Sequence, residues 1–137
     1  MTEQEKARIC LHAELIRIVG KMDSCCALIK QAGLDPVRDQ LMHIGKAIGQ
    51  LAEILKAINE RDPRLYPAFF KIKEEHMGSA IAQVEFAARE LAREENLAGA
   101  IALLRSYLET QGADMPEHRQ IASDEIVRFE LIIEAQA

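Results

Sequence analysis

Apolar residues recur at alternating steps of three and four along two consecutive stretches between residues 11 and 58. The first stretch carries Leu11, Leu15, Ile18, Met22, Cys25 and Ile29, and the second carries Val37, Leu41, Ile44, Ile48, Leu51, Leu55 and Ile58. Such spacing places the members of a stretch on one side of an α-helix, where they can face a partner helix. The sequence therefore predicts two long helices that pack along these apolar stripes.

The ends of these helices are marked by capping and turn residues. Thr2, followed three residues later by Glu5, has the form of a capping box, so the first helix is expected to span residues 3–32. The segment Gly33-Leu34-Asp35-Pro36 then supplies a left-handed helix end, an N-cap and a proline at the first helical position. The second helix should end near residue 60, before Asp62-Pro63. We therefore expect an antiparallel helical hairpin.

A third helix is expected from about Phe69 to Glu95. Its apolar stripe slips in the middle, and Gly78-Ser79 lies at the slip. Glycine and serine together are a common cause of helix kinks, so the pattern predicts a kink or a short break there.

The last part of the chain contains two more helix candidates. Asn96 can cap a fourth helix that ends at Gly112 as its left-handed C-terminal residue. Pro116 begins the final element, in which residues 125–133 fit both helical spacing and strand-like alternation. Helix is favoured, because no second strand candidate exists to pair with a strand here.

Length and composition agree with a small helical domain. The chain has 137 residues, of which 49% are hydrophobic and 28% charged, so it can bury a single core without a metal or disulfide staple. The fold class expected is all-α, an antiparallel bundle of four to five helices built on the N-terminal hairpin, in one domain covering residues 1–137.

Charge and aromatic content argue against several partners. The net charge is -5, aromatic residues make up 4% of the chain and tryptophan is absent, which disfavours both duplex binding and base stacking. No basic leader or long apolar run is present, so we expect no membrane association and a cytoplasmic, bacterial location. The sequence predicts no nucleic-acid partner.

No metal or cofactor is expected. None of the four histidines has a glutamate three residues before it, which the carboxylate-bridged metal sites of helical bundles require. Met22, Cys25 and Cys26 offer soft sulfur ligands, but adjacent cysteines on a helix point in different directions, and Cys10 is the only other thiol. We interpret the three cysteines as buried structural thiols.

His43 is the one candidate for covalent chemistry. It is expected on the outer side of the second helix with Lys46 one turn away, where a neutral imidazole could accept a phosphoryl group and the lysine could balance its charge. The run Met42-His43-Ile44-Gly45-Lys46-Ala47 resembles the signature of histidine phosphotransfer domains, although Gly45 replaces an apolar residue and Ala47 replaces a glycine. The resemblance implies a phosphoryl relay with a receiver protein as partner.

Two other groups are candidate binding residues. Gly45 and Gly49 form a small-xxx-small pair that permits close approach of another helix, either from a partner or from within the chain. An aromatic group with a methionine could line a ligand pocket at one end of the bundle or belong to the core. Its members are Tyr66, Phe69, Phe70 and Met77.

The sequence thus predicts a non-enzymatic helical interaction module, a small regulatory or adaptor protein. It would act through amphipathic helix faces, either as a homodimer or with another helical protein, since a long apolar rod in a short chain tends to leave apolar surface uncovered. The alternatives are a phosphoryl relay through His43 and a carrier of a small apolar ligand.

Overall fold

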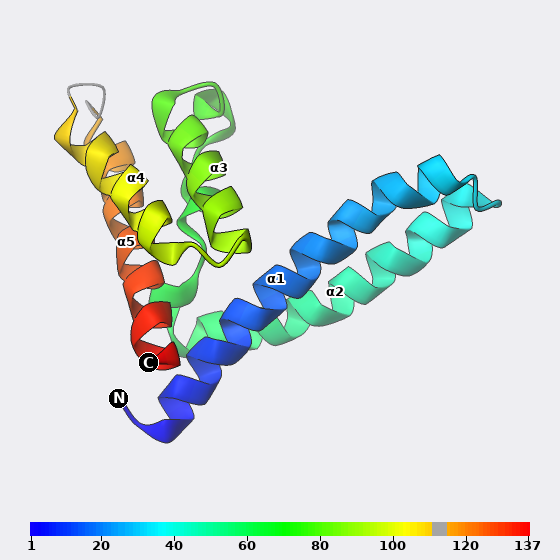
Figure 1. The fold of residues 1–137 in the computed structure, drawn as a ribbon, viewed down its shortest axis with the longest axis horizontal. Coiled ribbons are helices and arrows are strands. Elements are labelled where there is room, and N and C mark those ends of the chain that lie inside the picture. Colours follow the sequence, from blue (N-terminus) through cyan, green and yellow to red (C-terminus); the bar gives the residue numbers. More distant parts are fainter. Residues whose placement is uncertain (111–114) are drawn as a thin grey trace. The chain divides into compact units, whose positions relative to one another are not determined.

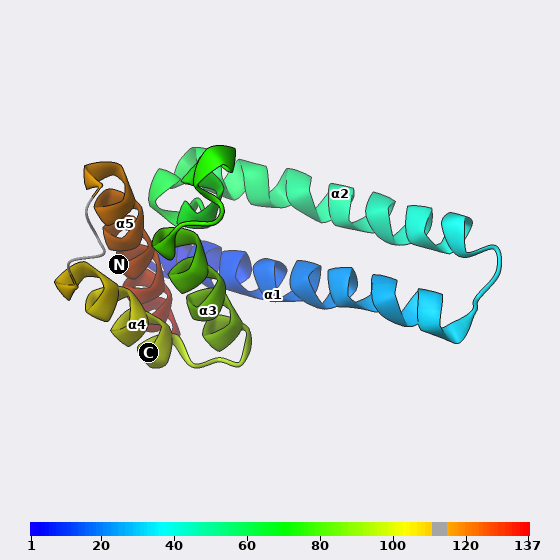
Figure 2. The same cartoon turned by 90° about the horizontal axis from the view of Figure 1, so that it is seen from above.

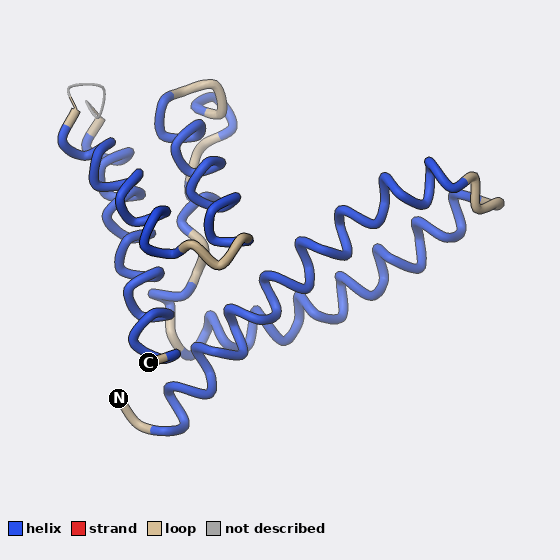
Figure 3. The backbone as a smooth tube through the Cα atoms, viewed as in Figure 1, coloured by secondary structure: helices blue, strands red, loops and turns tan. Residues whose placement is uncertain are grey.

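A computed structural model describes residues 1–110 and 115–137, and every element in them is helical (Figures 1 and 3). The α-helices are α1 (Glu3–Ala32), α2 (Val37–Arg61), α3 (Ala80–Arg93), α4 (Leu97–Glu109) and α5 (Pro116–Gln136). Three short 3-10 turns lie between α2 and α3: η1 (Pro63–Leu65), η2 (Ala68–Lys71) and η3 (Glu74–His76). The predicted all-α bundle built on an N-terminal hairpin is confirmed.

The chain forms two compact units. One is the hairpin of residues 2–63, and the other comprises residues 64–137 together with Met1. Each unit is described by itself below. The single domain expected from the chain length stays a prediction.

The hairpin begins and turns largely as its sequence predicts. The Thr2 hydroxyl accepts a hydrogen bond from the Glu5 amide, and the Glu5 carboxylate accepts one from the Thr2 amide, which completes the capping box. Gly33 closes α1 with φ 59°, in the left-handed region. The start of α2 was predicted one residue too early. Pro36 keeps an extended ψ of 117° and is itself the N-cap residue, so the first helical residue is Val37.

The two long helices lie side by side in both views of the chain (Figures 1 and 2). All seven residues of the α2 stripe are half-buried or buried, as predicted. On α1 the prediction is wrong for half of the stripe, because Leu11, Ile18 and Cys25 are exposed. The less exposed line on α1 runs instead through Leu15, Val19, Met22, Cys26 and Ile29. A neighbouring helix covers only one side of a stripe this wide, and α2 covers the side away from Leu11.

The second unit has a core of its own. Helix α3 packs on α4, and α4 packs on α5, so the three helices enclose apolar side chains between them. The largest apolar side chains buried there belong to Leu65, Ile81, Leu104 and Phe129. The Asn96 side chain caps α4 by accepting a hydrogen bond from the Gly99 amide at 2.9 Å, as predicted.

The third helix starts later than its sequence predicts. The α-helix expected from Phe69 begins only at Ala80, and the preceding segment folds into the short turns η1, η2 and η3. Prolines 63 and 67 and the extended backbone of Ile72 and Lys73 interrupt helical hydrogen bonding before Gly78 is reached. The break is therefore longer than the kink or short interruption that Gly78-Ser79 suggested. Glu95, two residues after the end of α3 at Arg93, has an unexpected left-handed φ of 63°.

The last element is a helix throughout. Residues 125–133 lie within α5, which begins at Pro116, and no strand exists in the described parts of the chain. The C-terminal role predicted for Gly112 lies outside the described residues. Among the described residues, no helix combines the length and the apolarity that crossing a bilayer requires.

Two glycines of the hairpin, one in its turn and one inside α2, allow a matched test of the turn. Gly33→Ala should lower the free energy of unfolding by about 1 kcal/mol, because alanine is strained at a φ of 59°. Gly49→Ala should raise it by about 0.5–1 kcal/mol, because Gly49 is helical and no atom lies within 4 Å of the position that a Cβ would take. Urea unfolding followed by circular dichroism measures both. Equal effects of the two substitutions would contradict the assigned turn.

Candidate functional site

A line of exposed apolar side chains runs along α1 in the hairpin. Leu11 and Ile18 keep 47% and 42% of their surface exposed, and Cys25 is also exposed. These three residues, spaced by seven, are called the outer stripe below. Residue spacing of seven returns to nearly the same side of a helix, so the outer stripe is one continuous ridge.

Little of the hairpin is buried anywhere along its length. Between residues 16 and 57, all of which are described, no side chain is buried, although more than half of these residues are apolar. Monomeric proteins rarely leave extended apolar surface uncovered, and surfaces of this kind mark contacts with other proteins. Residues 2–63 contain nine Lys and Arg and nine Asp and Glu, so net charge does not oppose contact between two such hairpins.

His43 and Lys46 lie on the exposed side of α2. The helix continues without interruption past Ala47, to Arg61. An exposed imidazole with an exposed ammonium one turn away is accessible to another protein, which a phosphoryl relay requires. The relay itself stays a prediction.

Gly45 and Gly49 are both exposed, and apart from the neighbouring backbone of α2 itself no atom of the described residues lies within 4 Å of a Cβ position at either. The small-xxx-small pair therefore does not serve close helix packing within this chain. Docking of a partner helix at these glycines stays a prediction.

The predicted aromatic group is brought together on the second unit. The rings of Tyr66 and Phe70 lie 6.0 Å apart between centroids, and those of Phe69 and Phe70 lie 5.9 Å apart. Two residues missed by the sequence analysis join them: the Phe86 ring is 4.9 Å from that of Phe69, and the Arg89 guanidinium lies 4.3 Å above the Phe69 ring. Phe70 and Phe86 keep 58% and 53% of their surface exposed, so the group is at the surface.

Met77, the fourth member of the predicted ligand site, follows η3 and is exposed. The next residue toward the N-terminus, His76, contacts α5 instead. Its Nδ1 lies 3.2 Å from Nε2 of His118, and the two rings meet edge to face. One ring must donate and the other accept in such a contact, which ties the turn η3 to the first turn of α5.

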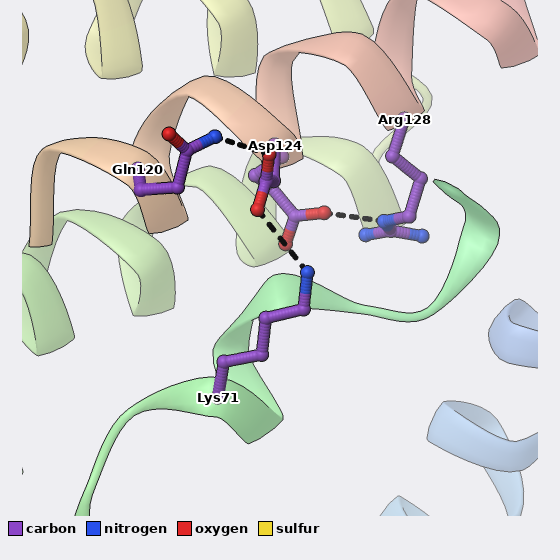
Figure 4. Close-up of polar contacts among 5 residues, drawn as sticks. Lys71, Gln120, Asp124 and Arg128 are labelled. Atoms are coloured by element: carbon purple, nitrogen blue, oxygen red, sulfur yellow. Dashed lines mark hydrogen bonds and ion pairs between the residues drawn. The ribbon is translucent and has the colours of Figure 1, made fainter. Parts of the chain in front are cut away.

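A buried polar cluster lies between α3 and α5. Glu85 and Glu125 are both 0% exposed, and Arg128 is 4% exposed. Nε of Arg128 donates a short hydrogen bond to Oε1 of Glu125 (Figure 4). Both oxygens of Glu85 and Oε2 of Glu125 meet no hydrogen-bond donor. Two carboxyl groups thus share the buried space with one close guanidinium.

The pKa of Glu85 is raised to about 9, first by burial and then by the charge of Glu125 and a hydrogen bond with Glu125, while Arg128 and Arg89 lower it by less. Glu85 is therefore protonated at neutral pH, and its hydroxyl can donate to Glu125. Burial also lowers the pKa of Arg89, the nearest cation on α3.

The edge of this cluster is a set of surface contacts. Nζ of Lys71 in η2 lies 3.2 Å from Oδ2 of Asp124, and the Gln120 amide donates to Oδ1 of the same carboxylate at 2.8 Å (Figure 4). Asp124 and Glu125 are adjacent on α5. The Asp124 carboxylate ties η2 to α5 through Lys71, and the Glu125 carboxylate is buried toward α3. The cluster fixes the packing of the second unit.

A pair of carboxyl groups with different protonation states is also typical of acid–base catalysis. Here Glu85 and Glu125 are fully buried, so no substrate in solution can reach them. The cluster is accordingly a structural feature of the helix packing.

Metal-binding groups and thiols are arranged as follows. In the residues that the structure describes, no three His, Cys, Asp or Glu side chains are placed to hold a metal ion together. None of the three thiols forms a disulfide in the part of the chain that the structure describes, and the interpretation of them as buried is wrong: Cys25 is exposed, and Cys10 and Cys26 are half-buried. Cysteine is apolar enough for either side of a stripe, so its type alone did not reveal which side α2 covers.

Sequence reasoning missed Glu85 and Glu125 as cluster residues, although a signal was present. Glu85 lies four residues after Ile81 and three before Ala88, and Glu125 lies four residues before Phe129, so both occupy core positions of their helices. A glutamate at such a position is rarely buried without a partner. Which partner it meets depends on the packing of α3 on α5.

Comparisons with known proteins give no further guidance. No protein-family model, no curated protein and no solved structure matches this chain.

The protonated state of Glu85 makes stability depend on pH. The folded protein holds this proton up to about pH 9, whereas the unfolded chain releases it near pH 4.5. Between these values the folded state binds more protons, so its stability is highest at the acidic end and the free energy of unfolding falls by up to about 1.4 kcal/mol per pH unit. Glu85→Gln keeps a neutral side chain and should flatten this slope, raising stability at pH 8 by a few kcal/mol.

The matched control is Glu90→Gln on the exposed side of α3, which should leave the slope unchanged because Glu90 pairs with Arg93 at the surface. Urea unfolding of the three proteins at each pH from 5 to 9 measures the slopes. An unchanged slope in Glu85→Gln would show that this carboxyl is ionised in the folded protein.

Proposed function

We propose that this protein is a non-enzymatic interaction module, a small regulatory or adaptor protein, that pairs with a second copy of itself through the outer stripe of its N-terminal hairpin. The observation that carries the proposal is the exposed heptad line Leu11, Ile18 and Cys25, which runs beside the line of α1 residues that α2 already covers. A ridge with this spacing suits packing against another helix.

A second copy is favoured as the occupant for two reasons. The hairpin has equal numbers of cationic and anionic residues, so a copy of the same surface meets no net repulsion. The ridge is also self-complementary under a two-fold axis, the commonest symmetry of soluble oligomers.

Ile18→Glu tests the proposal at the centre of the outer stripe. The substitution should raise the dimer dissociation constant on the order of a hundredfold, because the interface loses the buried isoleucines of both copies and gains two charges. Multi-angle light scattering over a dilution series measures the constant. Ala27→Glu is the control: Ala27 is exposed and lies nine residues on, about half a turn around α1 from Ile18.

Two results would overturn the proposal. One is a wild-type protein whose mass is that of a single chain even at high concentration. The other is a dimer that Ile18→Glu weakens no more than Ala27→Glu does.

A phosphoryl relay is the second candidate, favoured by the exposure of both His43 and Lys46 on α2. The phosphoryl group would pass from the aspartate of a phosphorylated receiver protein to the unprotonated imidazole nitrogen; the aspartate leaves as a free carboxylate, and the other ring nitrogen releases its proton to solvent. Incubation with such a receiver should give acid-labile, base-stable label on the wild type and on His76→Gln, and none on His43→Gln. Equal labelling of His43→Gln would exclude the relay.

A further inference from the structure

We infer that the two copies pair with their α1 helices antiparallel and centred on Ile18, so that each outer stripe lies against the other. This inference rests on the proposed dimer and adds its direction and register. It is carried by the positions of the stripe and of two charged residues that flank it.

The apolar residues of the stripe match when one helix is reversed about Ile18. Leu11 lies seven residues before Ile18 and Cys25 seven residues after it. Reversal therefore brings Leu11 of each copy level with Cys25 of the other, one such pair at each end of the stripe. In the middle, Ile18 lies level with Ile18 of the second copy. The ridge is about 21 Å long, at 1.5 Å per residue.

Charges beside the stripe distinguish this direction from the parallel one. Glu14 and Lys21 follow Leu11 and Ile18 by three residues, and so lie along the same edge of α1. Both are exposed, and Glu14 contacts Arg17 within its own helix at 2.7 Å. In the antiparallel arrangement Glu14 lies within about 1.5 Å along the axis of Lys21 of the second copy, twice per dimer. In a parallel pair this edge of one helix and the same edge of the other lie on opposite sides of the interface, so Glu14 and Lys21 of the two copies do not meet and these attractive contacts are absent.

Disulfide trapping tests the register. In the full-length chain carrying Cys10→Ala and Cys26→Ala, oxidised glutathione accepts the two electrons and two protons released when two thiols join. Cys25 alone should give no covalent dimer, and neither should Leu11→Cys with Cys25→Ser. Leu11→Cys with Cys25 retained should link most of the protein, because only then do two thiols lie level across the interface. Circular dichroism confirms that each variant is folded.

The outcomes separate this inference from the proposed dimer. Covalent dimers from Cys25 alone would show parallel helices and overturn the inference while leaving the dimer standing. A dimer by light scattering with no trapping in the Leu11→Cys protein would place the interface elsewhere. No dimer by light scattering would remove both.

A charge exchange gives an independent readout. Lys21→Glu should raise the dissociation constant on the order of fivefold, because it places a glutamate beside Glu14 of the other copy in both contacts along this edge. The exchange Glu14→Lys with Lys21→Glu should restore wild-type affinity. In a parallel pair Lys21 does not meet Glu14 of the other copy, so an unchanged dissociation constant in Lys21→Glu would overturn the antiparallel register.

Discussion

Two helices that pair can cover only the sides that face each other, and this limit decides what the N-terminal hairpin can be. Each helix of a pair loses exposure along one stripe, and the remaining circumference stays in contact with solvent. In α1 the stripe toward α2 passes through Leu15 and Met22, which leaves Leu11 and Ile18 uncovered. Apolar side chains such as Leu11 and Ile18 therefore keep much of their surface exposed, and a further helix is the most direct way to cover them.

The second unit covers more of its apolar surface, because three helices pack together instead of two. Its helices enclose a core containing Ile81, Leu104 and Phe129, each essentially without exposed surface. This core also accommodates Glu85 and Glu125, at a cost reduced by Arg128 and by a retained proton. A unit with buried polar groups depends on one well-defined packing, because a shift of α3 on α5 would separate the protonated Glu85 from Glu125 and leave its buried carboxyl group without a hydrogen bond.

The sequence predicts the helices better than it predicts their packing. Caps and breakers act locally, so Thr2, Gly33 and Asn96 marked their helix ends directly. The break before α3 is longer than the sequence predicts. The two prolines were read as a connector, but the extended residues after them were read as helix. Periodicity could not decide which half of the α1 stripe faces α2, since both halves are apolar and differ by a fraction of a turn. The pairing of Glu85 with Glu125 depends on long-range packing, and no local pattern specifies it.

The distribution of charge adds selectivity to the exposed hairpin. Residues 2–63 are balanced at nine cationic and nine anionic residues, so the whole net charge of -5 belongs to the rest of the chain. Anionic units of like sign repel one another and resist unspecific association, whereas the balanced hairpin carries no such barrier. Flanking charges such as Glu14 and Lys21 add a second level of selection, because they favour one helix direction and disfavour the other. Apolar residues thus provide the affinity of the hairpin surface, and the charges around them restrict which surface it accepts.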